Sequence, residues 1–160
     1  MSGQGRAWLV KTEPDVFGFD DLWRADARTT AWDGVRNYQA RNFLRDEMQI
    51  GDVVVIYHSN AQPPGAAGLA RVASAPYPDP AQFDPASPYH DPASPAAAPR
   101  WWSVDVRATA PLARLVPLAE LRSDPVLADL DLALLRRGNR LSVMPLPTAA
   151  VERIVALARG

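Results

Sequence analysis

The sequence predicts an α+β domain in which about five strands curl into a partly open barrel, with helices inserted early and added late. One observation behind this prediction is that short strand patterns are separated by helical segments at irregular spacing, which argues against a doubly wound parallel sheet. A second is that 160 residues, 48% of them hydrophobic, suit a single domain with its own core. A third is that internal repeats and glycine-rich phosphate loops are both missing from the sequence.

Periodicity and end signals place the elements in order. Extended segments are expected at 7–12, 29–32, 53–58, 66–72, 101–108 (running on toward residue 115) and 141–146. Helices are expected at 20–26, 37–48, 118–122, 124–135 and 149–158. Asp20, Asn37 and Thr148 are the expected N-terminal caps, and Gly68 predicts a β-bulge.

Residues 76–99 differ in composition from the rest of the chain. They hold eight of the sixteen prolines, a density that excludes a helix or a central strand. A loop of this length inside one domain is often functional or disordered. Because Phe83 and Tyr89 give it apolar side chains to bury, we expect an ordered loop lying over the domain.

The amino-acid composition and the net charge exclude several classes of protein. Without cysteine there are no disulfides, thiol nucleophiles or cysteine-bound zinc, which fits a reducing compartment. The net charge of −1 excludes a broad basic face for duplex DNA. Residues 1–5 are polar, no run of 18 apolar residues occurs, and there is no basic tail. These features favour a bacterial, cytoplasmic protein without a signal peptide or membrane span.

Catalytic constellations are sparse. His58 and His90 are the only histidines and lack metal-ligand spacing, so no metal is expected. Ser59 follows His58 directly, and neighbours on a strand point to opposite faces, which disfavours a hydrolase. Lys11 and Glu13 share a strand face, so they form either a general acid/base couple or a plain ion pair.

Lys11 is also the only lysine among seventeen basic residues. Its retention points either to a need for a compact ammonium group, which the planar guanidinium of arginine does not replace, or to chance.

The stretch from Trp32 to Asn42 carries the strongest functional signal. Trp32 stands at an Asp-Gly turn and is followed by Arg36, by Asn37 and then by a helix. An aromatic face beside a cation, an amide and a helix N-terminus suits a nucleobase; the alternative is that Trp32 is a hydrophobic plug under the helix. Arg41 and Arg45 fall on one helical face, where they are either solvated or contact a nucleic-acid backbone.

These motifs resemble the EVE domain proteins of the PUA-like superfamily, the group that includes the thymocyte nuclear protein family. The resemblance covers nearly the whole chain and rests on Trp8 to Pro14, the stretch 32–42, Tyr57 to Asn60, Gly68 to Ala70, Tyr77 to Asp79, 83–85, 87–89, Arg100-Trp101 and Arg140 to Val143. Thr12 departs from the pattern, in which serine is common, and its extra methyl group would narrow a pocket.

The resemblance implies a single domain over residues 1–160, a PUA-like mixed β pseudobarrel with flanking helices and a pocket for a nucleobase, often a modified one. The YTH readers of methylated adenosine belong to the same superfamily. By motif, the implied ligand-binding residues are Lys11, Thr12, Glu13, Trp32, Val35, Arg36, Asn37, Tyr57, His58, Ser59, Asn60, Ser142 and Val143. The implied partner is single-stranded or flipped-base DNA or RNA, and no cofactor is expected.

Three hypotheses therefore stand. The first is a non-enzymatic reader in which Trp32 stacks on a base and Lys11 and Arg36 hold the flanking phosphate. The second is a PUA-like enzyme acting on a nucleic acid or nucleoside through the Lys11 and Glu13 acid/base pair. The third is an interaction module that binds protein through the loop at 76–99.

Overall fold

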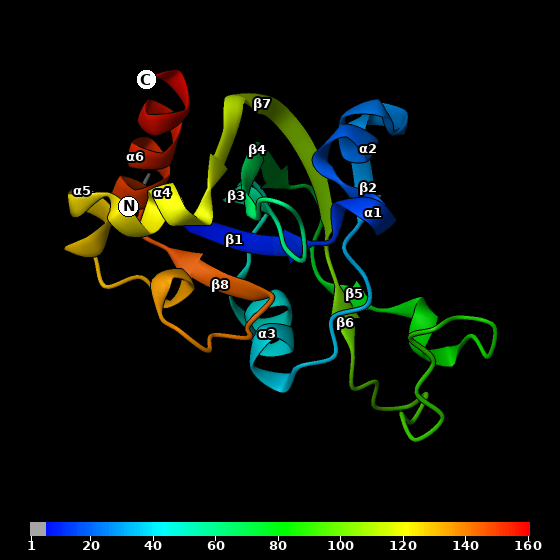
Figure 1. Cartoon of the computed structure of the whole chain (residues 1–160). Helices are drawn as coiled ribbons and strands as arrows, with labels where there is room; N and C mark the ends of the chain where they lie inside the picture. Colours follow the sequence, from blue (N-terminus) through cyan, green and yellow to red (C-terminus); the bar gives the residue numbers. More distant parts are fainter. Residues whose placement is uncertain (1–5) are drawn as a thin grey trace.

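The computed structural model describes residues 6–160, so the polar start at 1–5 lies outside the described residues. Within this range the main sheet has six strands, β1 (Ala7–Thr12), β2 (Thr29–Ala31), β3 (Val53–His58), β4 (Gly65–Val72), β7 (Asp105–Pro117) and β8 (Val143–Leu146). They run in the order β2-β7-β4-β3-β1-β8 and curl into a half-barrel (Figure 1). The predicted α+β class and partly open barrel are confirmed.

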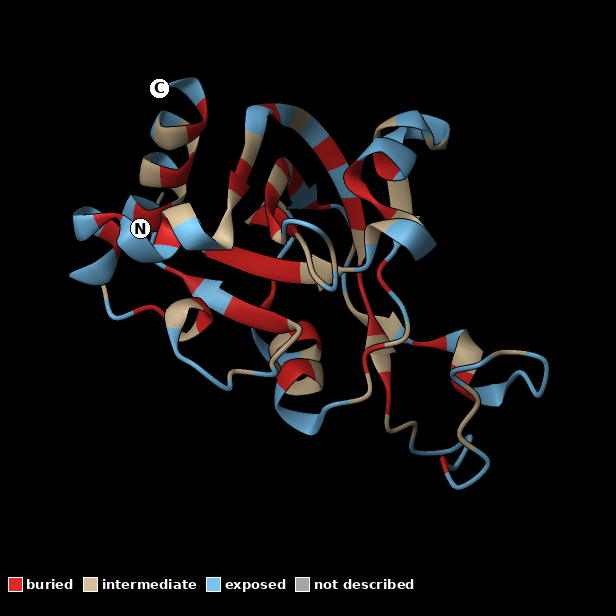
Figure 2. Cartoon of the chain, viewed as in Figure 1, coloured by how far each residue is buried: buried red, intermediate tan, exposed pale blue. Residues whose placement is uncertain are grey.

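β1 and β3 are neighbouring interior strands and pair in parallel, whereas the other pairs of the sheet are antiparallel. Their side chains alternate between two apolar clusters, because successive residues of a strand face opposite sides. Trp8 and Val10 lie in one cluster, while Leu9 lies in the other. Burial along β1 is nearly complete up to Lys11, where the strand reaches the edge of the core (Figure 2).

Helices cover both faces of the sheet. The first cluster packs beneath α2 (Phe19–Arg24) and α3 (Tyr38–Asn42), which continues as a π-helical turn through Glu47. The second packs beneath α4 (Leu118–Ser123), α5 (Pro125–Ala128) and α6 (Thr148–Arg159). Shorter turns are α1 (Pro14–Phe17), η1 (Asp26–Arg28) and η4 (Ala133–Leu135). Within residues 6–160, no helix has the length and apolar character needed to span a membrane.

The predicted caps meet different outcomes. Asn37 caps α3 as expected, because its Oδ1 accepts a hydrogen bond from the Ala40 amide at 2.9 Å. The prediction for Asp20 is wrong, since α2 begins after Gly18, whose amide donates to the Asp21 carboxylate. Thr148 is the first residue of α6, and Pro147 occupies the cap position.

Two other predictions concern chain geometry. The helix expected at 124–135 is wrong beyond Ala128, because Asp131 takes a left-handed φ of 51° that ends helical hydrogen bonding. The predicted bulge at Gly68 is confirmed by a register shift between β4 and β7. A Cβ at Gly68 would overlap the Phe19 ring, so glycine is required there unless that ring moves.

Residues 76–99, which we call the proline-rich lobe, begin with β5 (Tyr77–Pro78) and η3 (Pro80–Phe83), and β5 pairs with β6 (Trp102–Ser103). The lobe projects from the side of the half-barrel (Figure 1) and does not lie over it as predicted. Phe83 and Tyr89 stay about 40% exposed, and Gln82 is buried in their place. Gln82 Nε2 donates to the backbone carbonyls of Asp79 and Trp101, so a polar hub organises the lobe.

Candidate functional site

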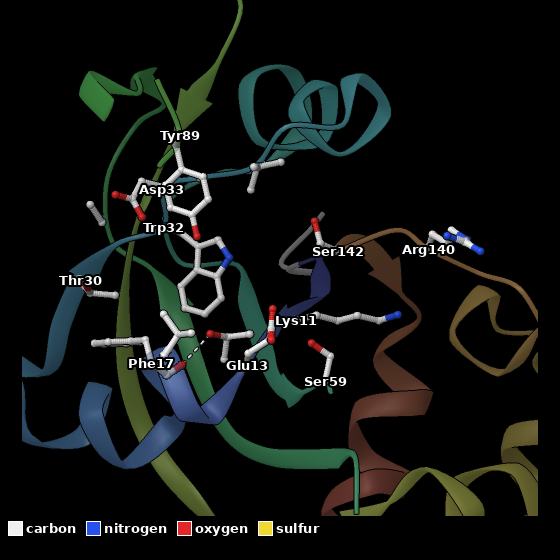
Figure 3. A pocket seen from close by; sticks show the side chains of 15 residues that line it. Lys11, Glu13, Phe17, Thr30, Trp32, Asp33, Ser59, Tyr89, Arg140 and Ser142 are labelled. Carbon is white, nitrogen blue, oxygen red and sulfur yellow. Dashed lines mark hydrogen bonds between the residues drawn. The ribbon is translucent and has the colours of Figure 1, made fainter. Parts of the chain in front are cut away.

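A cavity of about 630 Å³ opens at the carboxyl end of β1. Its walls come from the end of β1, from α1, from β2 and the turn after it, from the first residue after β3, from the lobe and from the loop before β8 (Figure 3). The lining residues are Lys11, Thr12, Glu13, Val16, Phe17, Thr30, Ala31, Trp32, Asp33, Gly34, Val35, Ser59, Tyr89, Arg140 and Ser142. This size lies within the range of small-ligand sites.

Backbone pairing explains why serines flank the end of β1. The Lys11 amide donates to the Ser142 carbonyl at 2.8 Å, and the Ser59 amide donates to the Thr12 carbonyl at 2.9 Å. Ser59 therefore lies on the β3 side of β1, and Ser142 lies on the β8 side. Three chain segments that are distant in sequence meet at one edge of the sheet, which is where polar side chains can face a ligand.

Trp32 forms the aromatic wall of the cavity. Its side chain is largely buried, and its backbone amide donates to the Val104 carbonyl at 2.8 Å. Among residues 6–160, nothing accepts a hydrogen bond from the indole N–H, which faces the cavity in Figure 3. Gly34 follows at a φ of 78°, which turns the chain away from the wall.

Tyr89 reaches the cavity from the proline-rich lobe and points toward Trp32 in Figure 3. A Cβ on Gly34 would lie 2.8 Å from its ring, so Tyr89 packs directly on the glycine backbone. From its sequence context, Tyr89 was expected only to anchor the loop. The contact with Gly34 bridges 55 positions, and no local pattern signals it.

Lys11 and Glu13 both line the cavity, as their shared strand face predicted. Glu13 Oε1 accepts a hydrogen bond from Asn60 Nδ2 at 2.9 Å. Burial lowers the pKa of Lys11, and no carboxylate of the described chain lies within ion-pair distance of its Nζ. The plain Lys11–Glu13 ion pair is therefore absent from residues 6–160.

Thr12 uses its hydroxyl within the protein. Its Oγ1 donates to the Phe17 carbonyl at 2.6 Å and so holds α1 against the end of β1. The serine that is common at this position in the family carries the same donor.

Two of the polar residues that were predicted to bind a ligand do not line the cavity and instead bond to other parts of the protein. Arg36 pairs with Asp79 at 3.0 Å and donates to the Tyr89 carbonyl at 2.8 Å. Asn37 caps α3. Both therefore stabilise the walls of the cavity from behind.

Four further predicted residues also lie outside the lining. His58 Nε2 accepts a hydrogen bond from the Phe19 amide at 3.0 Å, and burial lowers the pKa of this imidazole. Asn60 orients Glu13, as described above. Tyr57 is buried beneath Lys11, with Nζ 5.8 Å from the ring centre, and Val143 belongs to the core. These residues support the site without facing it.

The two arginines predicted to contact a nucleic-acid backbone lie on the helical segment 38–47 and have internal partners. Arg41 donates to the Arg100 carbonyl at 2.7 Å, and Arg45 pairs with Asp46 at 2.7 Å. Neither lines the cavity. In the described part of the chain, no three histidine, aspartate or glutamate side chains gather in a way that would hold a metal ion.

A curled half-barrel with an aromatic and polar cavity at the end of its first strand defines a PUA-like domain. The family model for the EVE domain matches residues 6–157. This chain therefore belongs to the EVE domain family, which confirms the resemblance found in the sequence.

Relatives and solved structures extend this result. The chain is 39% identical to human thymocyte nuclear protein 1 over 164 residues, which is 94% of this chain and 72% of that protein. It superposes with a TM-score of 0.90 and 38% identity on the crystal structure of human THYN1 protein in complex with 5-methylcytosine containing DNA, covering 98% of this chain and 99% of that one.

A more distant structure shows the fold alone. The YTH domain of the Zygosaccharomyces rouxii MRB1 protein, solved in complex with N6-methyladenosine RNA, superposes with a TM-score of 0.54 at 14% identity. The match covers 99% of this chain and 87% of that one.

Proposed function

We propose that this protein is a non-enzymatic reader of modified nucleic acid, which holds one unpaired or flipped-out base in the cavity beside Trp32. The observation that carries the proposal is the cavity of about 630 Å³ walled by Trp32, in a fold that matches the human protein solved with 5-methylcytosine containing DNA. A base stacked in a duplex cannot reach a recessed wall of this kind, so it must leave the stack or lie in a single strand.

Trp32 supplies the stacking surface. Stacking of a base on an aromatic side chain contributes about 1–3 kcal/mol and tolerates any base, because every base has a π face. The indole N–H adds a donor for a carbonyl oxygen or ring nitrogen at the base edge. Phe17 and Val35 line the same cavity and supply apolar surface for a methyl group.

Glu13 supplies the means to read the base edge. Its carboxylate lines the cavity and is oriented by the hydrogen bond from Asn60. A carboxylate accepts hydrogen bonds from the exocyclic amino group of cytosine. The ligand class is therefore an amino-bearing base, and a methylated cytosine meets both the carboxylate and the apolar surface.

Binding titrations test this proposal. Short fluorescently labelled single strands carry one cytosine, 5-methylcytosine, 5-hydroxymethylcytosine, adenine or N6-methyladenine each. We expect saturable binding with a preference for one modified base, and a loss of about 5- to 150-fold in affinity for Trp32→Ala. Trp23→Ala is the matched control, because Trp23 packs on Phe19 and Arg28 outside the cavity.

Two results would contradict the proposal. Equal binding of every strand with Trp32→Ala unchanged would show that the cavity holds no base. A chemically altered base in the strand recovered from the wild type, and not from Glu13→Gln, would favour the acid/base enzyme. Mass spectrometry of the recovered strand distinguishes a reader from an enzyme.

A further inference from the structure

One end of the cavity carries positive charge that no carboxylate of residues 6–160 neutralises by an ion pair. Lys11 and Arg140 both line this end and lie on the same side of the cavity in Figure 3. Over residues 6–160, neither side chain is hydrogen-bonded or ion-paired to another group. Lys11 is half-buried, so its ammonium group has given up part of its hydration, and its contact within residues 6–160 is the face of the Tyr57 ring and not a carboxylate.

Two hydroxyls accompany these cations. Ser59 and Ser142 flank the end of β1, and their backbones are fixed by hydrogen bonds to Thr12 and Lys11. In the described part of the chain, the hydroxyl of neither serine takes part in a hydrogen bond. Two cations and two hydroxyl groups therefore line the same end of the cavity, and Glu13 lies on the Trp32 side of Lys11 in Figure 3.

The other arginines near the cavity are not available in this way. Arg36 is engaged by the buried Asp79 carboxylate and the Tyr89 carbonyl, and Arg41 is engaged by the Arg100 carbonyl. A flanking phosphate needs charge-assisted donors that are not already satisfied.

We propose that Lys11 and Arg140, with the hydroxyls of Ser59 and Ser142, form a phosphate subsite for the phosphodiester next to the base held at Trp32. Resting on the proposed function, this inference narrows the ligand to a nucleotide within a strand. The free base and the nucleoside lack the group that this end of the cavity binds. Arg140 replaces Arg36 as the phosphate-binding arginine.

Competition against a labelled 5-methylcytosine strand tests the subsite. The competitors are 5-methyl-2′-deoxycytidine and its 3′- and 5′-monophosphates. We expect one monophosphate to bind about 10-fold more tightly than the nucleoside, as a charge-assisted hydrogen bond would produce. The monophosphate that binds more tightly than the nucleoside, 3′ or 5′, identifies the side of the base on which the phosphate lies.

Variants assign this gain to the named side chains. Arg140→Gln and Lys11→Gln are expected to abolish the difference in affinity between the monophosphate and the nucleoside. For a single strand, affinity falls with salt concentration, and each variant makes the slope of log affinity against log salt concentration less steep by about 0.7. Arg137→Gln is the matched control, since Arg137 is an exposed arginine of the same loop that does not line the cavity. Thermal unfolding checks that each variant remains folded.

Equal binding of nucleoside and both monophosphates would overturn the subsite, and so would identical behaviour of Arg140→Gln and Arg137→Gln. Either result leaves the proposed function standing if strand binding still depends on Trp32. Strand binding that ignores Trp32→Ala would instead overturn the proposed function itself.

Discussion

The Arg36 guanidinium lies 3.0 Å from the Asp79 carboxylate, and the Asp79 side chain is fully buried. This ion pair joins the turn after β2 to the proline-rich lobe across 43 positions of the sequence. Asp79 also accepts hydrogen bonds from the Gly34 and Ala81 amides at 2.9 and 2.8 Å. One carboxylate therefore fixes the turn, the lobe and the guanidinium together.

Replacing this carboxylate should destabilise the protein strongly. We expect Asp79→Ala to lower the free energy of unfolding by about 3 kcal/mol or more, because it leaves a largely buried arginine unpaired. Urea denaturation followed by circular dichroism measures this loss. Arg136→Ala is the control, since its ion pair with Asp131 is solvent-exposed and should contribute at most about 1 kcal/mol. Similar losses in the two variants would show that Asp79 does not hold the lobe.

Tyr89 and Phe83 give a matched test of the lobe in ligand binding. Both are aromatic residues of the lobe with about 40% exposure, and only Tyr89 lines the cavity. We expect Tyr89→Ala to reduce affinity for the preferred strand by about 5-fold or more, as the loss of one stacking surface would. Phe83→Ala should bind like the wild type. Fluorescence anisotropy compares them, and equal affinities would remove Tyr89 from the binding site.

The elements that the sequence predicts well depend on neighbouring residues. Val53 to Ile56 is a continuous β-branched run, and the Asn37 cap needs only the amide of Ala40 three positions on. Such patterns predict the strands of the main sheet, the cap of α3 and one edge of the cavity. The single-turn α5 shows the limit, because the left-handed Asp131 leaves no clear mark in the sequence.

Distant contacts explain what the sequence could not show. Arg36 and Arg41 look like ligand-binding arginines, yet their partners Asp79 and the Arg100 carbonyl lie 43 and 59 positions away. Arg140 lines the cavity from the loop before β8, and although it belongs to the motif Arg140 to Val143, its neighbours in the sequence do not mark it as a cavity residue. The residue types of a site can be recognised in the sequence, but tertiary contacts decide which of these side chains remain free to bind a ligand.

Substitutions of Asn37 test whether its side chain caps α3 or contacts the bound base. Because Oδ1 accepts from the Ala40 amide, we expect Asn37→Ala to cost about 1 kcal/mol of stability. Asn37→Ser keeps a capping oxygen and should restore stability and full strand affinity. Urea denaturation and strand titration are measured on both variants. A serine variant that is stable but binds poorly would assign the Asn37 amide to the ligand.

His58 gives the fold a predicted pH dependence. Burial lowers its pKa from the ordinary value of 6.5, while Asp20 and Asp21 act in the opposite direction. The unfolded chain therefore binds a proton more readily than the folded chain does. By linkage, the stability of the fold decreases as the pH falls below about 6.5, because the unfolded chain takes up the proton first. The decrease ends once His58 of the folded chain is also protonated, at its lower pKa. Protonation also removes the acceptor for the Phe19 amide.

Substitution by glutamine isolates this effect, since its side-chain oxygen can accept from the Phe19 amide without titrating. We expect His58→Gln to lose less stability than the wild type between about pH 7.5 and pH 5, where histidine changes charge. Urea midpoints at several pH values measure the difference. His90→Gln removes the other histidine, which lies in the proline-rich lobe, and should follow the wild-type curve. If His58→Gln also follows that curve, the protonation of His58 is not coupled to folding.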